Sequence, residues 1–284
     1  MVIHFFRERS KPRIDFYQLI DGYFDNLDNS TIKSNDDEVV ITINMNNFDF
    51  KYQYLITKRS RVSSLYRLNL DFININLLCE IPSVLPQYIS RLIFKQINDI
   101  CEKFELSIFC DAFDNIHTFD MFELITVLGK ERVLYMEEHE DVVTYKMPMN
   151  VLNDMCHYQS MINELHEYVK GDVVVKKYNI IKEKRTGAIR TSISWKAGTP
   201  MLFPPHLNYV QVEEEENLVA LIPIEIFYKY AEKLMNEVKD ADFKLLYMNE
   251  KTALKVKKLI KRMRKAIVSF TNFEEVKITD LVES

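Results

Sequence analysis

Residues 77–110 read LLCEIPSVLPQYISRLIFKQINDICEKFELSIFC, and this stretch decides which fold we expect. It opens as an apolar strand that ends at Pro82 and Pro86, because proline lacks the amide hydrogen that the interior of a strand or helix needs. From Tyr88 to residue 104, apolar residues recur every three or four positions, which predicts a helix that packs on one side. The short apolar segment 106–110 predicts a second strand.

The segments on either side of this stretch complete the first half of the chain. Helical spacing of apolar residues fills 14–27, and two strands over 38–45 and 48–56 flank Asn46-Asn47, which is typical of a tight turn. An alternating pattern predicts a third strand, and helical spacing returns after residue 118. The first half is therefore expected to contain, in order, a helix at 14–27, strands at 38–45, 48–56 and 68–81, a helix up to 104, a strand at 106–110 and a helix at 119–136.

The second half shows a similar order of elements. We expect a helix at 150–169, strands at 173–181, 188–195, 209–212 and 218–222, a helix from Pro223 to 238, a strand at 243–247 and a helix at 251–267. The final residues 271–284 form an acidic tail with a few apolar side chains, which docks as a strand or helix or stays loose.

Together these patterns predict an α+β protein with two sheet-and-helix units, 1–141 and 142–284. The segment 219–247 repeats the strand, proline, helix and strand of 77–110. This correspondence suggests an internal duplication, in which case the groove between the halves becomes a favoured binding surface. Two unrelated α+β halves are the alternative.

Composition excludes several classes of function. The 284 residues are 47% hydrophobic and 28% charged, with 37 Lys and Arg against 42 Asp and Glu, so the net charge is −5. A negative chain has no general attraction to nucleic acid or anionic membranes, and any such binding must be local. The five glycines lie far apart, so no Gly-rich phosphate-binding loop of the dinucleotide or Walker type can form.

Other features indicate a cytoplasmic protein without a membrane partner. The apolar residues at the N-terminus are too few for a signal peptide, and no apolar run approaches the length of a spanning helix. The four cysteines show no CxxC spacing, which is typical of buried free thiols in a reducing compartment and argues against disulfides or structural zinc. Frequent Ile, Asn, Lys, Tyr and Phe suggest an AT-rich genome, bacterial or phage.

Two basic clusters stand out against the negative background. The segment 251–265 holds eight Lys and Arg and no acid, while a helical apolar stripe predicts that one face packs. Such segregation can mark a phosphate-rich or acidic partner, or it can be a solvated face that offsets acids such as Glu213 to Glu216. The candidate nucleic-acid contacts are Lys58, Arg59, Arg61 and Arg67 in a loop, and Lys255, Lys258, Lys261, Arg262 and Lys265 in the helix.

Residues 195–206, WKAGTPMLFPPH, form an irregular segment with the single Trp and three of the eight prolines. Trp, Met and Phe are frequent anchors of protein interfaces, and prolines lower the ordering cost of a loop. We therefore name Trp195, Met201 and Phe203 as candidate partner-binding residues. The alternative is that this segment covers the sheet as part of the core.

The most enzyme-like segment is 110–120, where carboxylates and an imidazole follow a strand. Asp111, Asp114 and His117 are the candidate ligands of a divalent metal that would activate water. The same residues are also common turn formers and helix-capping residues, and their spacing matches no specific metal motif.

The sequence thus favours a non-enzymatic interaction protein, such as an accessory, immunity or defence-associated factor, that needs no cofactor. It would bind a protein partner through the groove between its halves and through exposed loops, and a homo-oligomer is compatible with this hypothesis. A nucleic-acid-associated protein is the first alternative and a metal-dependent hydrolase the second, so enzymatic activity stays open.

Overall fold

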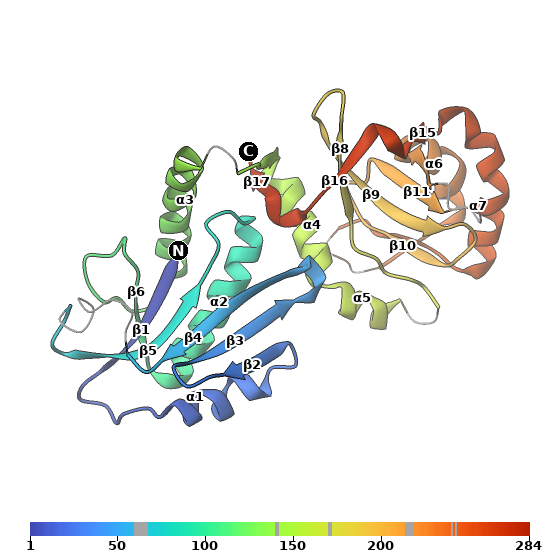
Figure 1. The fold of residues 1–284 in the computed structure, drawn as a ribbon. Coiled ribbons are helices and arrows are strands. Elements are labelled where there is room, and N and C mark those ends of the chain that lie inside the picture. The colour runs from blue at the N-terminus through green and yellow to red at the C-terminus, as the bar shows by residue number, and fades with distance from the viewer. Residues whose placement is uncertain (60–67, 140–141, 170–171, 214–218, 240, 242) are drawn as a thin grey trace. The chain divides into compact units, whose positions relative to one another are not determined.

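The computed structural model describes the chain except residues 60–67, 140–141, 170–171, 214–218, 240 and 242. It divides into two compact units, Met1–Val143 and Thr144–Ser284, which we call unit 1 and unit 2. The division expected from the sequence follows residue 141. Each unit combines helices with sheets (Figure 1), so the prediction of an α+β fold is confirmed.

Unit 1 is built on an antiparallel sheet whose described strands run in the order β2-β3-β4-β5-β1-β6. The predicted hairpin is confirmed, since Glu38 pairs with Thr57 and Met45 with Phe50. Its connection is a short 3-10 turn that ends at Asp49, whose φ of 51° is left-handed. The elements are β1 (Val2–Glu8), α1 (Phe16–Gly22), β2 (Ser30–Ser34), β3 (Glu38–Met45), β4 (Phe50–Thr57), β5 (Phe72–Glu80), α2 (Gln87–Phe104), β6 (Ser107–Phe109) and α3 (Met121–Glu138).

The core of unit 1 lies between this sheet and α2. The apolar stripe of α2 is fully buried, as its spacing predicts, and includes Ile93, Phe94 and Ile97. The hydroxyls of Tyr52 and Tyr54 on β4 both donate to Gln96 Oε1 on α2, the second at 3.2 Å. Burial raises the pKa of both tyrosines, so these hydroxyls stay protonated donors that join the helix to the sheet.

The N-terminal segment is a strand that the sequence analysis did not predict. β1 lies between β5 and β6, and Ile3, His4, Phe5 and Phe6 are all buried. Because both faces of the strand are covered, its apolar residues run consecutively instead of alternating, so the usual signal of a half-buried strand is missing.

Unit 2 contains a six-stranded sheet of order β15-β12-β11-β9-β8-β16 in the described residues. β9 and β11 are parallel, and the other neighbours in this sheet are antiparallel. The elements are β7 (Tyr145–Met147), α4 (Met149–Ser160), α5 (Ile162–Tyr168), β8 (Asn179–Glu183), β9 (Ile189–Lys196), β10 (Met201–Phe203), β11 (Tyr209–Glu213), β12 (Val219–Pro223), α6 (Ile224–Ala231), β13 (Asn236–Glu237), β14 (Leu246–Met248), α7 (Glu250–Met263), β15 (Val268–Ser269), β16 (Phe273–Val276) and β17 (Leu281–Glu283).

The C-terminal segment docks on its own unit. β16 pairs with β8, and β17 pairs with β7 in parallel. Phe273, Ile278 and Leu281 are buried, so the apolar side chains of the acidic tail supply the contacts that hold it.

Several expected elements of unit 2 are shorter than predicted. The helix expected over 150–169 is broken at Met161 into α4 and α5. The helix expected from Pro223 to 238 ends at Ala231, followed by a 3-10 turn and β13. The strand expected over 173–181 begins only at Asn179, with one isolated bridge from Val174 to Met201 before it. The last two boundaries coincide with strand pairing, because β13 pairs with β14 and Asn179 begins the pairing of β8 with β9. Local periodicity does not record such pairing.

The structure does not show the suggested duplication. In unit 1, β5 and β6 flank β1 in one antiparallel sheet. Their counterparts in unit 2 lie in different sheets, because β12 belongs to the six-stranded sheet and β14 pairs with β10 and β13. Among the helices in the described part of the chain, none is both long and apolar enough to cross a membrane.

The packing of α2 predicts a clear contrast between two phenylalanines of unit 1. Phe94 on α2 is fully buried, whereas Phe122 on α3 is 81% exposed. We expect Phe94→Ala to lower the free energy of unfolding by about 3–5 kcal/mol, because it leaves a cavity in the core. Phe122→Ala should change it by less than about 1 kcal/mol. Urea unfolding of both variants measures this, and equal losses would contradict the core assignment.

His4 predicts a pH dependence of the stability of unit 1. Burial lowers its pKa below the usual 6.5, and the nearby Asp111 only partly opposes this. As pH falls through the unfolded-state value, the unfolded chain takes up a proton that the folded chain does not, so stability falls. Urea unfolding at neutral and mildly acidic pH should show this loss, and His4→Gln should reduce it. The exposed His139→Gln is the control, and an unchanged pH dependence in His4→Gln would refute the assignment.

Candidate functional site

The strongest candidate site is the exposed face of α7. The helix begins at Asn249, whose side chain accepts a hydrogen bond from the Thr252 amide at 3.0 Å. Its apolar stripe is buried against α6 and β14, as the sequence spacing predicts, and consists of Ala253, Val256, Ile260 and Met263. This packing fixes which way the remaining side chains project.

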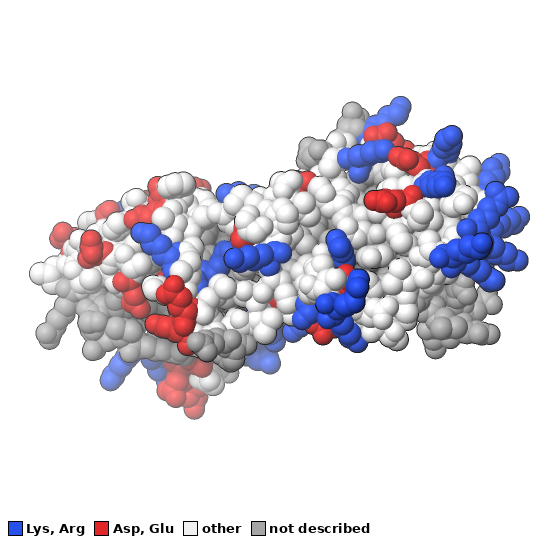
Figure 2. All heavy atoms as spheres, turned by 90° about the horizontal axis from the view of Figure 1, so that it is seen from above, with Lys and Arg blue, Asp and Glu red and all other residues white. Residues whose placement is uncertain are grey.

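The basic side chains of the helix lie on its solvent side. All five helix candidates named from the sequence are exposed, together with three further cations. Figure 2 shows Lys and Arg gathered over α7. Within the described residues, none of them lies within 4 Å of a carboxylate. We call this surface the α7 cationic face; its residues are Lys251, Lys255, Lys257, Lys258, Lys261, Arg262, Arg264 and Lys265.

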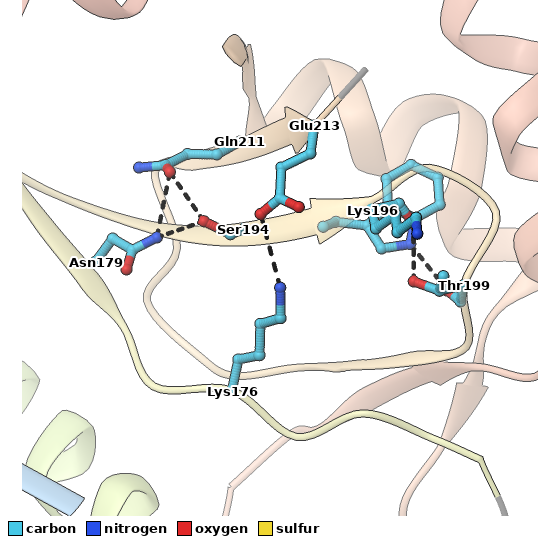
Figure 3. A network of polar contacts seen from close by, with 8 residues as sticks. Lys176, Asn179, Ser194, Lys196, Thr199, Gln211 and Glu213 are labelled. Carbon is cyan, nitrogen blue, oxygen red and sulfur yellow. Dashed lines mark hydrogen bonds and ion pairs between the residues drawn. The ribbon is translucent and has the colours of Figure 1, made fainter. Parts of the chain in front are cut away.

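Glu213 to Glu216 are the acids expected to neutralise the α7 cationic face. Glu213, the one that the structure describes, pairs with a different cation. Glu213 lies 3.8 Å from Lys176 Nζ, on the sheet side of the unit (Figure 3). Both side chains are more than a third exposed, so this surface ion pair contributes little to stability. Glu214, Glu215 and Glu216 lie outside the described residues.

The loop between β9 and β10 supports α7. Gly198 has a φ of +97°, and a Cβ there would lie 3.1 Å from Lys257 Cδ and 3.5 Å from Leu254. Thr199 fixes this loop, because its carbonyl accepts from Trp195 Nε1 at 2.9 Å and its hydroxyl donates to the Lys196 carbonyl at 2.8 Å (Figure 3). The glycine lets the loop approach the helix closely.

The expected apolar patch at Trp195, Met201 and Phe203 is not on the surface. The three residues are 0%, 1% and 1% exposed. Trp195 and Phe203 both pack on Phe227 of α6, with ring centroids 5.6 and 5.4 Å apart. Trp195 and Phe203 therefore pack between their strands and α6, so this segment covers the sheet as part of the core.

A polar network crosses the sheet of unit 2, and Figure 3 shows its members on β8, β9 and β11. Asn179 Nδ2 donates to Ser194 Oγ at 2.7 Å and Gln211 Oε1 at 3.2 Å. Gln211 Nε2 donates to Ser192 Oγ at 2.8 Å. Because these side chains hydrogen-bond to one another, the network joins β8, β9 and β11 across the sheet.

The second basic cluster is only partly described. Lys58 and Arg59 are exposed in unit 1, whereas Arg61 and Arg67 lie outside the described residues. Unit 1 therefore presents at least two of the predicted cations to solvent.

The predicted metal ligands do not come together. Asp111 and Asp114 are exposed, while His117 Nδ1 lies 3.3 Å from Glu123 Oε2 and its ring stacks on Phe113. No group of three or more His, Cys, Asp or Glu side chains in the described parts of the chain is placed to hold a metal ion. The segment shows the turn and capping roles instead, with Asp120 accepting from the Glu123 amide at 2.9 Å.

The cysteines are buried and free, as their spacing predicts. Burial raises the pKa of Cys101 to about 12 and of Cys110 to about 11. It also raises the pKa of Cys79 and Cys156. A thiol with so high a pKa is almost entirely protonated at neutral pH and is a poor nucleophile.

One pairing of titratable side chains escaped the sequence analysis. His206 Nε2 lies 2.7 Å from Asp154 Oδ2, and His206 has a left-handed φ of 56°. Such a pair can orient an imidazole as a general base. The hydroxyl of Thr191 donates to the His206 carbonyl and not to its ring. No sequence signal reveals this pair, because the two residues are 52 positions apart.

Comparison with known proteins adds no family assignment: no family model, curated protein or solved structure matches the chain.

Proposed function

We propose that the protein is an interaction protein that binds nucleic acid through the α7 cationic face. The observation that carries this proposal is the alignment of Lys251, Lys255, Lys258 and Arg262 along one exposed side of the helix. Their spacing of four, three and four residues places them one above another. They span about 16 Å, which is the length of several phosphates along a nucleic-acid strand.

The electrostatic surroundings support this proposal. The helix carries no acid between Lys251 and Lys265, and the buried stripe prevents it from turning its cations inward. A chain with a net charge of −5 that keeps eight cations together on one surface concentrates positive potential there. Counterion release from phosphates then provides the driving force for binding.

A protein partner bound through the Trp195 segment has less support. That interpretation needed Trp195, Met201 and Phe203 on the surface, and all three are buried. An acidic protein would compete for the same α7 cationic face, and an acidic polypeptide distinguishes this partner from nucleic acid.

The central prediction concerns a variant that neutralises the aligned cations. In K251Q/K255Q/K258Q/R262Q, the affinity for a labelled duplex of about 20 base pairs should fall about 100-fold or more, because each lost phosphate contact removes roughly 1 kcal/mol or more. Fluorescence anisotropy measures the affinity for DNA and RNA duplexes, and circular dichroism checks that the helix remains folded.

The matched control removes the same charge elsewhere. Lys33, Lys51, Lys229 and Lys233 are exposed and lie outside α7, so K33Q/K51Q/K229Q/K233Q should bind almost as the native chain does. An equal loss in both variants would show that only net charge matters and would refute a site on α7. Displacement of the duplex by polyglutamate at equal charge concentration would indicate an acidic protein partner instead.

Salt provides an independent test. If α7 contacts about four phosphates, the affinity of the native chain should fall about 100-fold between 50 and 200 mM salt. The quadruple α7 variant should show a much flatter dependence. Anisotropy titrations at several salt concentrations give the slope, and a flat dependence for the native chain would contradict phosphate recognition.

A further inference from the structure

Unit 1 contains a surface pocket that no part of the proposed function uses. It has a volume of about 330 Å³ and lies where the segment after β1 meets the C-terminal end of α2. This volume is at the lower end of the range for small-molecule sites. The lining residues are Arg7, Pro12, Arg13, Ile14, Gln18, Lys103, Phe104 and Glu105.

The residues that line this pocket carry more positive than negative charge. Three of its lining residues are cations, and Glu105 is the single carboxylate among them. Glu105 is already shared, since it lies 3.4 Å from Arg7 Nη2 and 3.6 Å from Lys11 Nζ. The lining therefore keeps an excess of positive charge that its own acid does not balance.

Part of this positive charge has a structural role at the helix end. Arg7 Nη1 donates to the Phe104 carbonyl at 2.8 Å, and Lys103 Nζ donates to the Gly22 carbonyl. Cations at a helix C-terminus offset the partial negative charge of its free carbonyls. Arg13 has no such role, because it is exposed and contacts no carboxylate among the described residues.

Arg7 also has unused donor capacity. Its side chain is only 13% exposed, and its Nε is buried without a hydrogen-bond partner in the described part of the chain. A buried unpaired donor is costly, and an anionic oxygen is the acceptor that satisfies a guanidinium best. Gln18 accepts from the Asp15 amide at 3.0 Å through Oε1, which leaves its amide hydrogens available as donors.

From these observations we infer that the pocket binds a phosphate-bearing small molecule. Arg13, Lys103 and Arg7 would contact the phosphate oxygens, because guanidinium groups match the geometry of a phosphate in bidentate contacts. Pro12, Ile14 and Phe104 line the rest of the pocket, and these apolar residues suit an apolar part of the same ligand.

Inorganic pyrophosphate is the probe for this inference. Calorimetric titration of the full chain at low salt should show one binding site. Arg13→Gln should weaken it about tenfold, since one charge-assisted hydrogen bond contributes roughly 1.5 kcal/mol. Arg13→Lys should recover part of the loss. Arg13 is exposed, so these variants should unfold at the same urea concentration as the native chain.

The control is Lys51→Gln, which removes one exposed cation of unit 1 outside the pocket and should bind pyrophosphate as the native chain does. Absence of pyrophosphate binding, or equal weakening in Arg13→Gln and Lys51→Gln, would overturn the inference.

The same variants distinguish a failure of this inference from a failure of the nucleic-acid proposal. The quadruple α7 variant should still bind pyrophosphate, and Arg13→Gln should still bind the duplex. If Arg13→Gln weakens duplex binding as much as pyrophosphate binding, the pocket recognises phosphates of nucleic acid, and a small-molecule ligand is overturned.

Discussion

The aromatic contacts of Phe227 hold together the parts of unit 2 that matter for its proposed function. Phe227 of α6 is fully buried and packs on Trp195 of β9 and Phe203 of β10. α7 in turn packs on α6, so the position of its cations depends on this cluster. Aromatic side chains bury large areas and pack in defined geometries, which makes them effective at fixing one helix orientation.

In unit 1 the N-terminal strand β1 has two structural roles. Its apolar side chains complete the core of the sheet, since Ile3, Phe5 and Phe6 are buried on both of its faces. Its C-terminal end also places Arg7 against the C-terminal end of α2, in the lining of the unit 1 pocket. The same strand therefore supplies both packing and a cation for the inferred phosphate site.

Charge segregation explains how a net negative chain can offer cationic surfaces. Attraction of a phosphate depends on the local potential within about one Debye length, roughly 8–10 Å in physiological salt. The α7 cationic face and the lining of the unit 1 pocket each place several cations within a short distance, with few acids among them. Glu213, for example, pairs with Lys176, so it lowers the net charge of the chain without neutralising the α7 cationic face.

The sequence alone determined the features that depend on local periodicity. The buried and exposed faces of α2 and α7 follow from the 3.6-residue repeat of their apolar residues. The hairpin of β3 and β4 follows from the alternation around Asn46-Asn47. The burial of the four cysteines follows from their apolar neighbours. The candidate cations of α7 could be named for the same reason, because an amphipathic helix fixes which side chains face solvent.

Features that depend on contacts between distant residues became visible only in the folded chain. The covered position of β1, the burial of Trp195 and the pairing of Asp154 with His206 all join segments far apart in the chain. The pocket at Arg7 needs the end of β1 beside the end of α2, some 97 residues later. Such contacts form because sheet pairing and core packing bury the most apolar surface, and no local pattern records which partner a segment finds.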